Sequence, residues 1–402
     1  MTVTNFPYGI NTPFTTTAIT AAETAAGVTP TDYSYPPGNV MRYGAITDGT
    51  RTGTAPNENN EGTDNTTAIQ NAINVQDANV GGGGGQVFIP PGNFLVTSLT
   101  VPTSVQLMGI QQQGWQGGST LLQSQSAVDH LITMTPSGTP PAGDYQHWSL
   151  VKNLFLYGDS RVVGPVDGIN VDVYDMGEGF TIDRVSVVAF SGNGIHANQS
   201  GATAATLNDL HLFRNAVNGL YIEGGGTAGW QGLWISKISG DNNVTSLIKI
   251  KTSLTNGENW TIRDIKAETT NGADQQNTII LEDVAGPIKI ENLSQRVNGG
   301  SATLNSVVQL AGTNNACLVL ENISTGSNGG ATPATYWIDD VKNTLTLAAS
   351  EGFGSGIHYL VWNGGEVFKL DKNGTYILDA GPVAWGANDT GGVGKKALVV
   401  DN

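Results

Sequence analysis

The most constraining feature of this sequence is a short motif that returns every 25 to 31 residues. It consists of an aliphatic residue, any residue, a polar residue and a second aliphatic residue, and it occurs seven times between residues 148 and 325. The copies are Val151–Leu154, Ile182–Val185, Leu207–Leu210, Ile235–Ile238, Ile262–Ile265, Ile290–Leu293 and Leu320–Ile323. All 14 flanking positions are aliphatic, which at a hydrophobic content of 39% would arise by chance roughly twice in a million trials. A period of this length is typical of a solenoid, in which each turn stacks on the one before it.

Each repeat also contains a second β-forming segment after the motif. Three of these segments start alike, at residues 167–171, 193–197 and 218–222, and later repeats have strand-like segments in the same place. Two or three short strands in each turn of about 28 residues is the layout of a parallel β-helix, whose successive strands pair at about 4.8 Å. We therefore expect an all-β solenoid.

The polar position of the motif is Asn or Asp in five of the seven copies: Asn153, Asp209, Asp264, Asn292 and Asn322. A sharp bend between two strands needs a residue that tolerates left-handed backbone geometry, and Asn and Asp do so best after Gly. Arg184 and Lys237 occupy the same position in the other two copies. We interpret the whole column as structural, so Asp209 and Asp264 are predicted to be bend residues rather than catalytic acids.

The composition agrees with a turn-rich β protein and narrows the choice of partners. Gly contributes 54 of 402 residues, and charged residues only 13%. The net charge of −16 disfavours nucleic acids and anionic membranes. Cys317 is the only cysteine, so neither an intrachain disulfide nor a cysteine-based metal site is expected, and nothing indicates a metal or a cofactor. We also expect no secretion signal and no membrane span.

Three regions are expected along the chain. Residues 1–36 lack the repeat, and we predict them to be a separate attachment arm. Residues 37–350 should form the β-helix, with a strand over 40–45 and an amphipathic helix near 64–79 that begins at Asp64. Such a helix would cover the open hydrophobic end of the first turn. Residues 351–402 are predicted to be a small C-terminal β region.

Residues 39–110 resemble the start of the pectate-lyase-like superfamily of right-handed parallel β-helices. The resemblance is carried by the segments VMRYGA at 40–45, DG at 48–49, DNTTAIQNAI at 64–73, the glycines at 81–85 and VFIPPG at 87–92. A long stretch between Gly49 and Asp64 departs from the family pattern, in which only a few residues are usual. The resemblance implies a right-handed parallel β-helix with an N-terminal capping helix.

Within this superfamily the chain is most similar to bacteriophage tailspikes and tail fibre proteins, because its Gly-rich ending at 391–400 resembles those of phage tail proteins. That similarity implies a homotrimer, an N-terminal segment that binds a virion tail or baseplate protein, and a β-helix that binds or cleaves host cell-surface polysaccharide. The polygalacturonase signature and the calcium-dependent lyase pattern of the superfamily are not found. Catalytic residues therefore do not carry over from the family.

The register of the repeat indicates where chemistry could occur instead. Counting from the polar column, the second and fourth residues after it point outward on each turn. Asp241 and Glu268 occupy the fourth position on consecutive turns, about 5 Å apart along the axis. Two carboxylates about 5–5.5 Å apart suit retaining glycoside hydrolysis. We predict Asp241 and Glu268 to be the catalytic pair; the alternative is a solvated surface on which charges happen to stack.

Substrate-binding residues are predicted on the outward faces. On the same face as the pair, an acidic sugar could be held by His211, Arg214, Lys266 and Arg296. Tyr221, on a second strand, and Trp230 could stack on sugar rings. Trp234 could do the same, but a buried or trimer-interface role is favoured because it falls near an inward column. On the second strands, Asp172 with Glu223 forms a wider alternative carboxylate pair, whereas Glu223, Lys251 and Glu282 alternate in sign and are interpreted as structural pairing.

Three functional hypotheses follow. The first is a phage tailspike, located in the virion, that binds host polysaccharide and is able to depolymerise it as a glycoside hydrolase or lyase. The second is a free extracellular polysaccharide-degrading enzyme. The third is a structural fibre or adaptor of a virion without a catalytic site. Release of reducing ends, or of unsaturated products, separates the enzymes from a binder.

Overall fold

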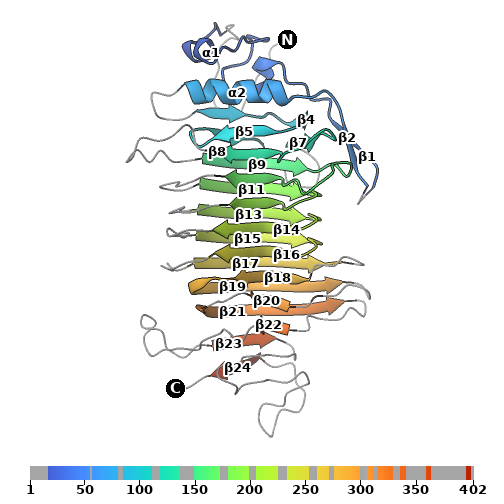
Figure 1. The fold of residues 1–402 in the computed structure, drawn as a ribbon, viewed down its shortest axis with the longest axis vertical. Helices are drawn as coiled ribbons and strands as arrows, with labels where there is room; N and C mark the ends of the chain where they lie inside the picture. Colours follow the sequence, from blue (N-terminus) through green and yellow to red (C-terminus); the bar gives the residue numbers. More distant parts are fainter. Residues whose placement is uncertain are drawn as a thin grey trace, which may run out of the picture.

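A computed structural model describes most of the repeat region and parts of both ends of the chain. The described residues are 17–54, 57–79, 85–110, 118–135, 149–172, 180–198, 205–224, 233–252, 260–270, 276–298, 304, 306–311, 315–328, 336–340, 359–363 and 395–399. Within them the predicted all-β parallel β-helix is confirmed, with one helix, α2 (Thr66–Ala78), lying across the N-terminal end of the stack (Figure 1). None of the helices in these ranges is long and apolar enough to cross a membrane.

Two sheets of parallel strands run the length of the solenoid. The short-strand sheet consists of β5 (Leu99–Pro102), β8 (Ile132–Thr135), β10 (Ile169–Asp172), β12 (Ile195–Asn198), β14 (Asn218–Gly224), β16 (Ser246–Thr252), β18 (Asn277–Glu282), β20 (Ser306–Ala311) and β22 (Tyr336–Asp340). The long-strand sheet carries the motif and contains β3 (Gln86–Phe88), β6 (Gln106–Met108), β9 (Ser149–Tyr157), β11 (Phe180–Val188), β13 (Ala205–Phe213), β15 (Leu233–Asp241), β17 (Trp260–Thr269), β19 (Ala285–Asn298) and β21 (Asn315–Asn328). Alongside β9 lie β7 (Ser119–Gln123) and its neighbour β4 (Gly92–Val96).

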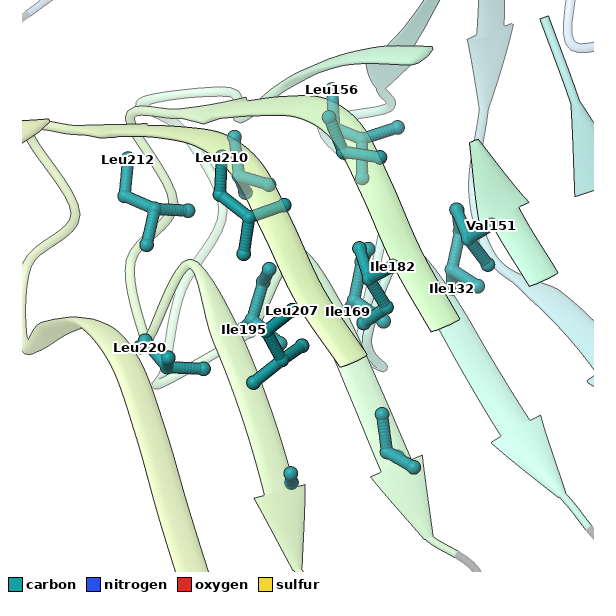
Figure 2. Packing of buried hydrophobic residues seen from close by; sticks show 14 of the residues in the cluster. Ile132, Val151, Leu156, Ile169, Ile182, Ile195, Leu207, Leu210, Leu212 and Leu220 are labelled. Carbon is teal, nitrogen blue, oxygen red and sulfur yellow. The ribbon is translucent and has the colours of Figure 1, made fainter. Parts of the chain in front are cut away.

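Alternate residues of both sheets meet in one apolar core. In β13, Leu207, Leu210 and Leu212 are buried, while their outward neighbours are not. Figure 2 shows Ile169 and Ile195 of the short-strand sheet stacked in the same interior. Burial of one such side chain stabilises the fold by about 1.5–3 kcal/mol. Because the core lies between the two sheets, outward residues of one sheet point away from those of the other.

The polar column of the motif bends the long strands, as predicted. Six of its members have left-handed backbone geometry: Asn153 (φ 57°), Arg184 (54°), Asp209 (54°), Lys237 (55°), Asp264 (58°) and Asn292 (56°). The ladder skips them, since β11 and β13 pair at Asp183–Asn208 and resume at Val185–Leu210. Each long strand therefore has two outward faces, one before and one after the bend.

The two cations in this column give the first testable prediction. A side chain with a Cβ costs about 1–2 kcal/mol in left-handed geometry, and Asn tolerates it best after Gly. Lys237→Asn is therefore expected to preserve or raise the free energy of unfolding, and Lys237→Val to lower it by about 1–2 kcal/mol. Urea titration measures both. Lys266, an outward residue of the same sheet away from the bend column, is the control. If Val is tolerated equally at both positions, the bend does not determine the residue type.

The N-terminal cap forms close to its predicted place, with one local correction. The carboxylate of Asp64 holds the first turn of α2 by accepting hydrogen bonds from the N–H and hydroxyl of Thr66. The prediction of a strand over 40–45 is wrong, because Val40–Tyr43 forms the 3₁₀ helix η1. The Asn39 side chain accepts a hydrogen bond from the Met41 N–H at its start, and Gly44 ends it at φ 92°.

Residues 17–36 pack against this cap. Ala22, in α1 (Ala21–Ala25), belongs to the main apolar core. Glu23 and Arg42 form a fully buried ion pair of 2.5 Å, and Arg42 also donates hydrogen bonds to three backbone carbonyls between residues 17 and 35. The described part of the predicted arm is thus fixed to the solenoid. Residues 1–16 lie outside the described residues, and an attachment role stays a prediction.

The described residues between Gly49 and Asp64 form a hairpin along one side of the solenoid. Its strands, β1 (Thr50–Thr52) and β2 (Asn59–Glu61), pair antiparallel and lie beside the first turns of the solenoid (Figure 1). The Asn60 side-chain amide donates hydrogen bonds to the backbone carbonyls of Gln123, Tyr157 and Gly158. These hydrogen bonds therefore hold the hairpin, which departs from the family pattern, against the side of the solenoid.

Two described strands lie near the C-terminus. β23 (Tyr359–Asn363) pairs parallel with β21, and β24 (Lys395–Val399) pairs antiparallel with β23. The region boundary at residue 351 lies outside the described residues and stays a prediction.

Candidate functional site

The register of the long-strand sheet brings the predicted carboxylates together. Asp241 of β15 lies beside Glu268 of β17, and Glu268 lies beside Arg296 of β19. On its other side Asp241 lies beside Phe213 of β13. Neighbouring parallel strands are about 4.8 Å apart, so the two residues lie on adjacent turns, and their catalytic role stays a prediction. We call the outward residues after the bend in these four strands the carboxylate face.

Asp241 is half-buried, and its surroundings retain its proton. Burial and the negative charge of Glu268 raise the pKa of Asp241 to about 6, although Thr270 and Arg214 act in the opposite direction. The Thr270 hydroxyl lies 3.4 Å from Oδ2 of Asp241. Glu268 accepts a hydrogen bond from the side-chain amide of Asn298. A carboxyl whose pKa is raised to about 6, beside a second carboxyl, has the arrangement of a general acid and its partner.

The hairpin reaches the edge of this face through Glu58. The Glu58 side chain accepts hydrogen bonds from the Tyr157 hydroxyl at 2.9 Å and from Arg214 at 3.0 Å. Arg214 also donates to the Tyr157 hydroxyl at 2.6 Å, and the Arg51 guanidinium lies over the Tyr157 ring. Arg214 is therefore engaged by the hairpin, and it acts on Asp241 through its charge. Its predicted role of holding an acidic sugar stays a prediction.

That charge gives a second prediction. Because Arg214 lowers the pKa of Asp241, its replacement by Met is expected to raise that pKa above about 6. The change is made together with Glu58→Gln so that no buried carboxylate is left unpaired. Titration of ¹³C-carboxyl-labelled aspartate, assigned with Asp241→Asn, measures the shift. Arg263→Met, which removes an exposed cation before the bend, is the control. An unchanged titration of Asp241 would show that Arg214 does not act on it.

Three other predicted binding residues lie on the carboxylate face. His211 and Lys266 flank Ser239 in register, one on each neighbouring strand. The His211 ring is hydrogen-bonded to the Ser239 hydroxyl at 2.6 Å. Lys266 and Arg296 are exposed, and Arg296 lies beside Glu268. The face thus places the cations Lys266 and Arg296 close to Glu268, and the binding role of these residues stays a prediction.

Tyr221 and Trp234, the aromatic candidates that the structure describes, lie away from this face. Tyr221 points outward from the short-strand sheet, and its ring lies between His196, stacked at 4.8 Å, and the Lys249 ammonium at 5.4 Å. His196 and Lys249 occupy both sides of the ring, and its predicted role of stacking on a sugar stays a prediction. Trp230 lies outside the described residues. Trp234 points outward on β15 and is 53% exposed, so the prediction of a buried position is wrong, whereas the predicted trimer-interface role stays a prediction.

A second polar cluster, missed as a site by the sequence prediction, lies on the short-strand sheet. The buried Asp167 carboxylate lies 3.4 Å from His130 and 3.3 Å from His196. The other nitrogen of His196 lies 3.4 Å from Glu223.

The predicted ion pair of Lys251 with Glu282 is present at 3.3 Å. Asp172 and Glu223 lie on the same column with Asn198 between them, as the register predicts. The tertiary approach of His130 and His196 to one carboxylate leaves no spacing signal in the sequence.

This cluster predicts a stability that depends on pH. Burial alone disfavours the charged ring, but Asp167 and Glu223 raise the pKa of His196 above its ordinary value of 6.5. The stabilisation is therefore complete below pH 6.5 and is lost as the pH rises through the folded-state pKa. We expect the urea midpoint of the wild type to fall as the pH rises through this pKa. In His196→Gln the same increase in pH should lower the midpoint by a smaller amount. Identical pH profiles for the two proteins would contradict the assignment.

Among the described residues, no group of three or more His, Cys, Asp or Glu side chains is placed to hold a metal ion. The donors on the carboxylate face are two carboxylates with cations beside them, which suits proton transfer more than metal binding.

Comparison with known proteins yields similar solved structures only. No family model matches the chain, and no curated protein matches it. ORF18 of Geobacillus virus E2 is 16% identical, with a TM-score of 0.46 over 83% of this chain and 67% of that one. The A-module of the Azotobacter vinelandii mannuronan C-5 epimerase AlgE6 is 18% identical, with a TM-score of 0.45 over 75% and 88%. Tailspike protein 2 of the Escherichia coli O157:H7 bacteriophage CAB120 is 13% identical, with a TM-score of 0.33 over 76% and 41%. At these identities the similarity is one of architecture, and the chemistry depends on this chain's own residues.

Proposed function

We propose that this protein binds a host cell-surface polysaccharide along the carboxylate face and hydrolyses it, as a bacteriophage tailspike. The observation that supports hydrolysis is the in-register pair of Asp241 and Glu268, with the pKa of Asp241 raised to about 6. A retaining mechanism needs two carboxyl groups about 5–5.5 Å apart, and a strand spacing of about 4.8 Å is compatible with that separation.

In this mechanism Asp241 is the general acid. It donates its proton to the leaving glycosidic oxygen, while the Glu268 carboxylate attacks the anomeric carbon and forms a glycosyl-enzyme ester. Asp241, now ionised, then removes a proton from water, which releases the sugar and restores Glu268. Arg296 pairs with Glu268, and Lys266 lies two residues before Glu268 on β17, so both would hold acidic substituents of the glycan.

We further propose a homotrimer whose N-terminal residues attach to a virion tail or baseplate protein. The support is the sequence resemblance to phage tail proteins together with the buried Glu23–Arg42 pair. That pair would transmit an N-terminal attachment directly to the solenoid. Sedimentation equilibrium tests the stoichiometry.

Incubation of the protein with purified host capsules and lipopolysaccharide tests the function. Hydrolysis releases reducing ends, whereas a lyase releases unsaturated products that absorb in the ultraviolet. Glycan binding without either product would contradict the hydrolase proposal and support a tailspike that only binds glycan. Absence of both binding and cleavage across the phage's own host range would favour a structural fibre.

A further inference from the structure

We propose that the carboxylate face carries a second, independent activity: transfer of an acyl group from a sugar ester to Ser239, with His211 as the base and Asp209 as its positioning partner. Ser239 Oγ lies 2.6 Å from Nδ1 of His211, and Nε2 of His211 lies 3.7 Å from Oδ1 of Asp209. A hydroxyl within hydrogen-bond reach of an imidazole, whose other nitrogen faces a carboxylate, is the arrangement that activates serine nucleophiles.

The register of the solenoid produces this contact. Ser239 of β15 pairs directly with His211 of β13. Both are the second residue after a bend and therefore point outward on adjacent strands. Asp209 is itself the bend residue of β13, at φ 54°, which brings its side chain to the same edge as the imidazole. The bend column predicted to be purely structural thus contributes a chemical group here.

The imidazole is also held in orientation. His211 and Phe213 lie on the same strand with ring centroids 6.2 Å apart and an interplanar angle of 8°. Phe213 itself packs against the outer apolar cluster that contains Val188. A base that is stacked on one side and hydrogen-bonded to its nucleophile meets the geometric requirement for proton transfer.

The reaction balances with these groups and water alone. The Ser239 oxygen attacks the ester carbonyl while His211 takes the hydroxyl proton. The tetrahedral intermediate collapses, the bond to the sugar oxygen breaks, and His211 returns the proton to that oxygen. Water, activated by the same imidazole, then hydrolyses the acyl-serine, releases the carboxylic acid and regenerates the hydroxyl. Lys266, in register with Ser239 on β17, lies where it would stabilise the developing oxyanion.

The position of these groups points to an ester carried on a polymer. The side chains of His211 and Asp209 are 41% and 39% exposed on the outer surface of a sheet, so a chain laid across the turns reaches them without entering a pocket. Backbone N–H groups of the sheet are committed to the parallel ladders, so a side-chain cation has to serve the oxyanion. An O-acylated glycan fits these conditions.

The test uses the full chain with a fluorophosphonate probe and p-nitrophenyl acetate. We expect covalent labelling at Ser239, mapped by peptide mass spectrometry, and a rate of ester hydrolysis that falls at least about a hundredfold in Ser239→Ala. The matched control is Ser294→Ala, an exposed serine in the same outward column, which should behave as the wild type. Asp209→Asn keeps a residue suited to the bend and should lower the rate about tenfold or more.

Three results would overturn the proposal: no labelling of the folded wild type, labelling at another residue, or Ser239→Ala with wild-type ester hydrolysis. Loss of ester hydrolysis in Ser239→Ala with depolymerisation of a de-esterified glycan unchanged would support it. The outcome does not depend on Asp241 and Glu268, so the two activities stand or fall separately.

Discussion

Replacement of Asp241 by asparagine is expected to reduce glycan hydrolysis by about two to four orders of magnitude, with KM changed by less than about threefold. The amide cannot donate the proton that the leaving oxygen needs. Because burial and Glu268 raise the pKa of Asp241 to about 6, the wild type should lose activity as the pH rises above about 6. Reducing-end assays from pH 4 to 8 measure both effects.

The control for this substitution lies one turn away in the same sheet. Asp264→Asn removes a carboxylate from β17, but the bend column accommodates Asn at Asn153 and Asn292 with the same left-handed geometry. We expect activity within about twofold of the wild type, since surface substitutions that keep the backbone are close to neutral. Glu268→Gln should resemble Asp241→Asn. If Asp241→Asn and Glu268→Gln both keep wild-type rates, the carboxylate face is not the catalytic site.

The register of this face could be predicted from the sequence because one motif determines both the in-out alternation and the strand neighbours. That is why the pairing of Asp241 with Glu268 and the left-handed geometry of Arg184 and Lys237 are found in the structure. The repeat could not predict contacts made by residues outside the repeat. Arg214 is engaged by Glu58, which lies 156 residues earlier in an insertion outside the repeat.

The short-strand sheet shows the same limit. Alternation placed Tyr221 and His196 outward on neighbouring turns, and the structure agrees. Whether a ring stands free or is stacked depends on side-chain rotamers and on the neighbours above and below it. His196 and Lys249 occupy both sides of Tyr221, and no periodicity encodes that choice.

The second large effect is expected at the N-terminal cap, where Glu23→Gln should lower the free energy of unfolding by about 3–5 kcal/mol. The substitution leaves the guanidinium of Arg42 buried without its counter-charge, since both side chains are fully buried. Although burial alone opposes ionisation, hydrogen bonds from Arg42, Thr20 and Tyr43 lower the pKa of Glu23 to about 2. The pair therefore stabilises the fold above pH 4.5, and the contribution is lost as the pH falls toward 2.

Hydrogen exchange with mass spectrometry locates this effect. Peptides that cover residues 17–45 should exchange faster in Glu23→Gln, whereas those from β13 to β17 should not, because each turn of a solenoid contacts only its neighbours. The matched control is the double substitution Glu23→Gln with Arg42→Met, which removes the unpaired charge and should recover part of the lost stability. Unchanged exchange over 17–45 in the single variant would mean that the pair does not fix these residues to the cap, and an attachment at the N-terminus would then be only loosely coupled to the β-helix.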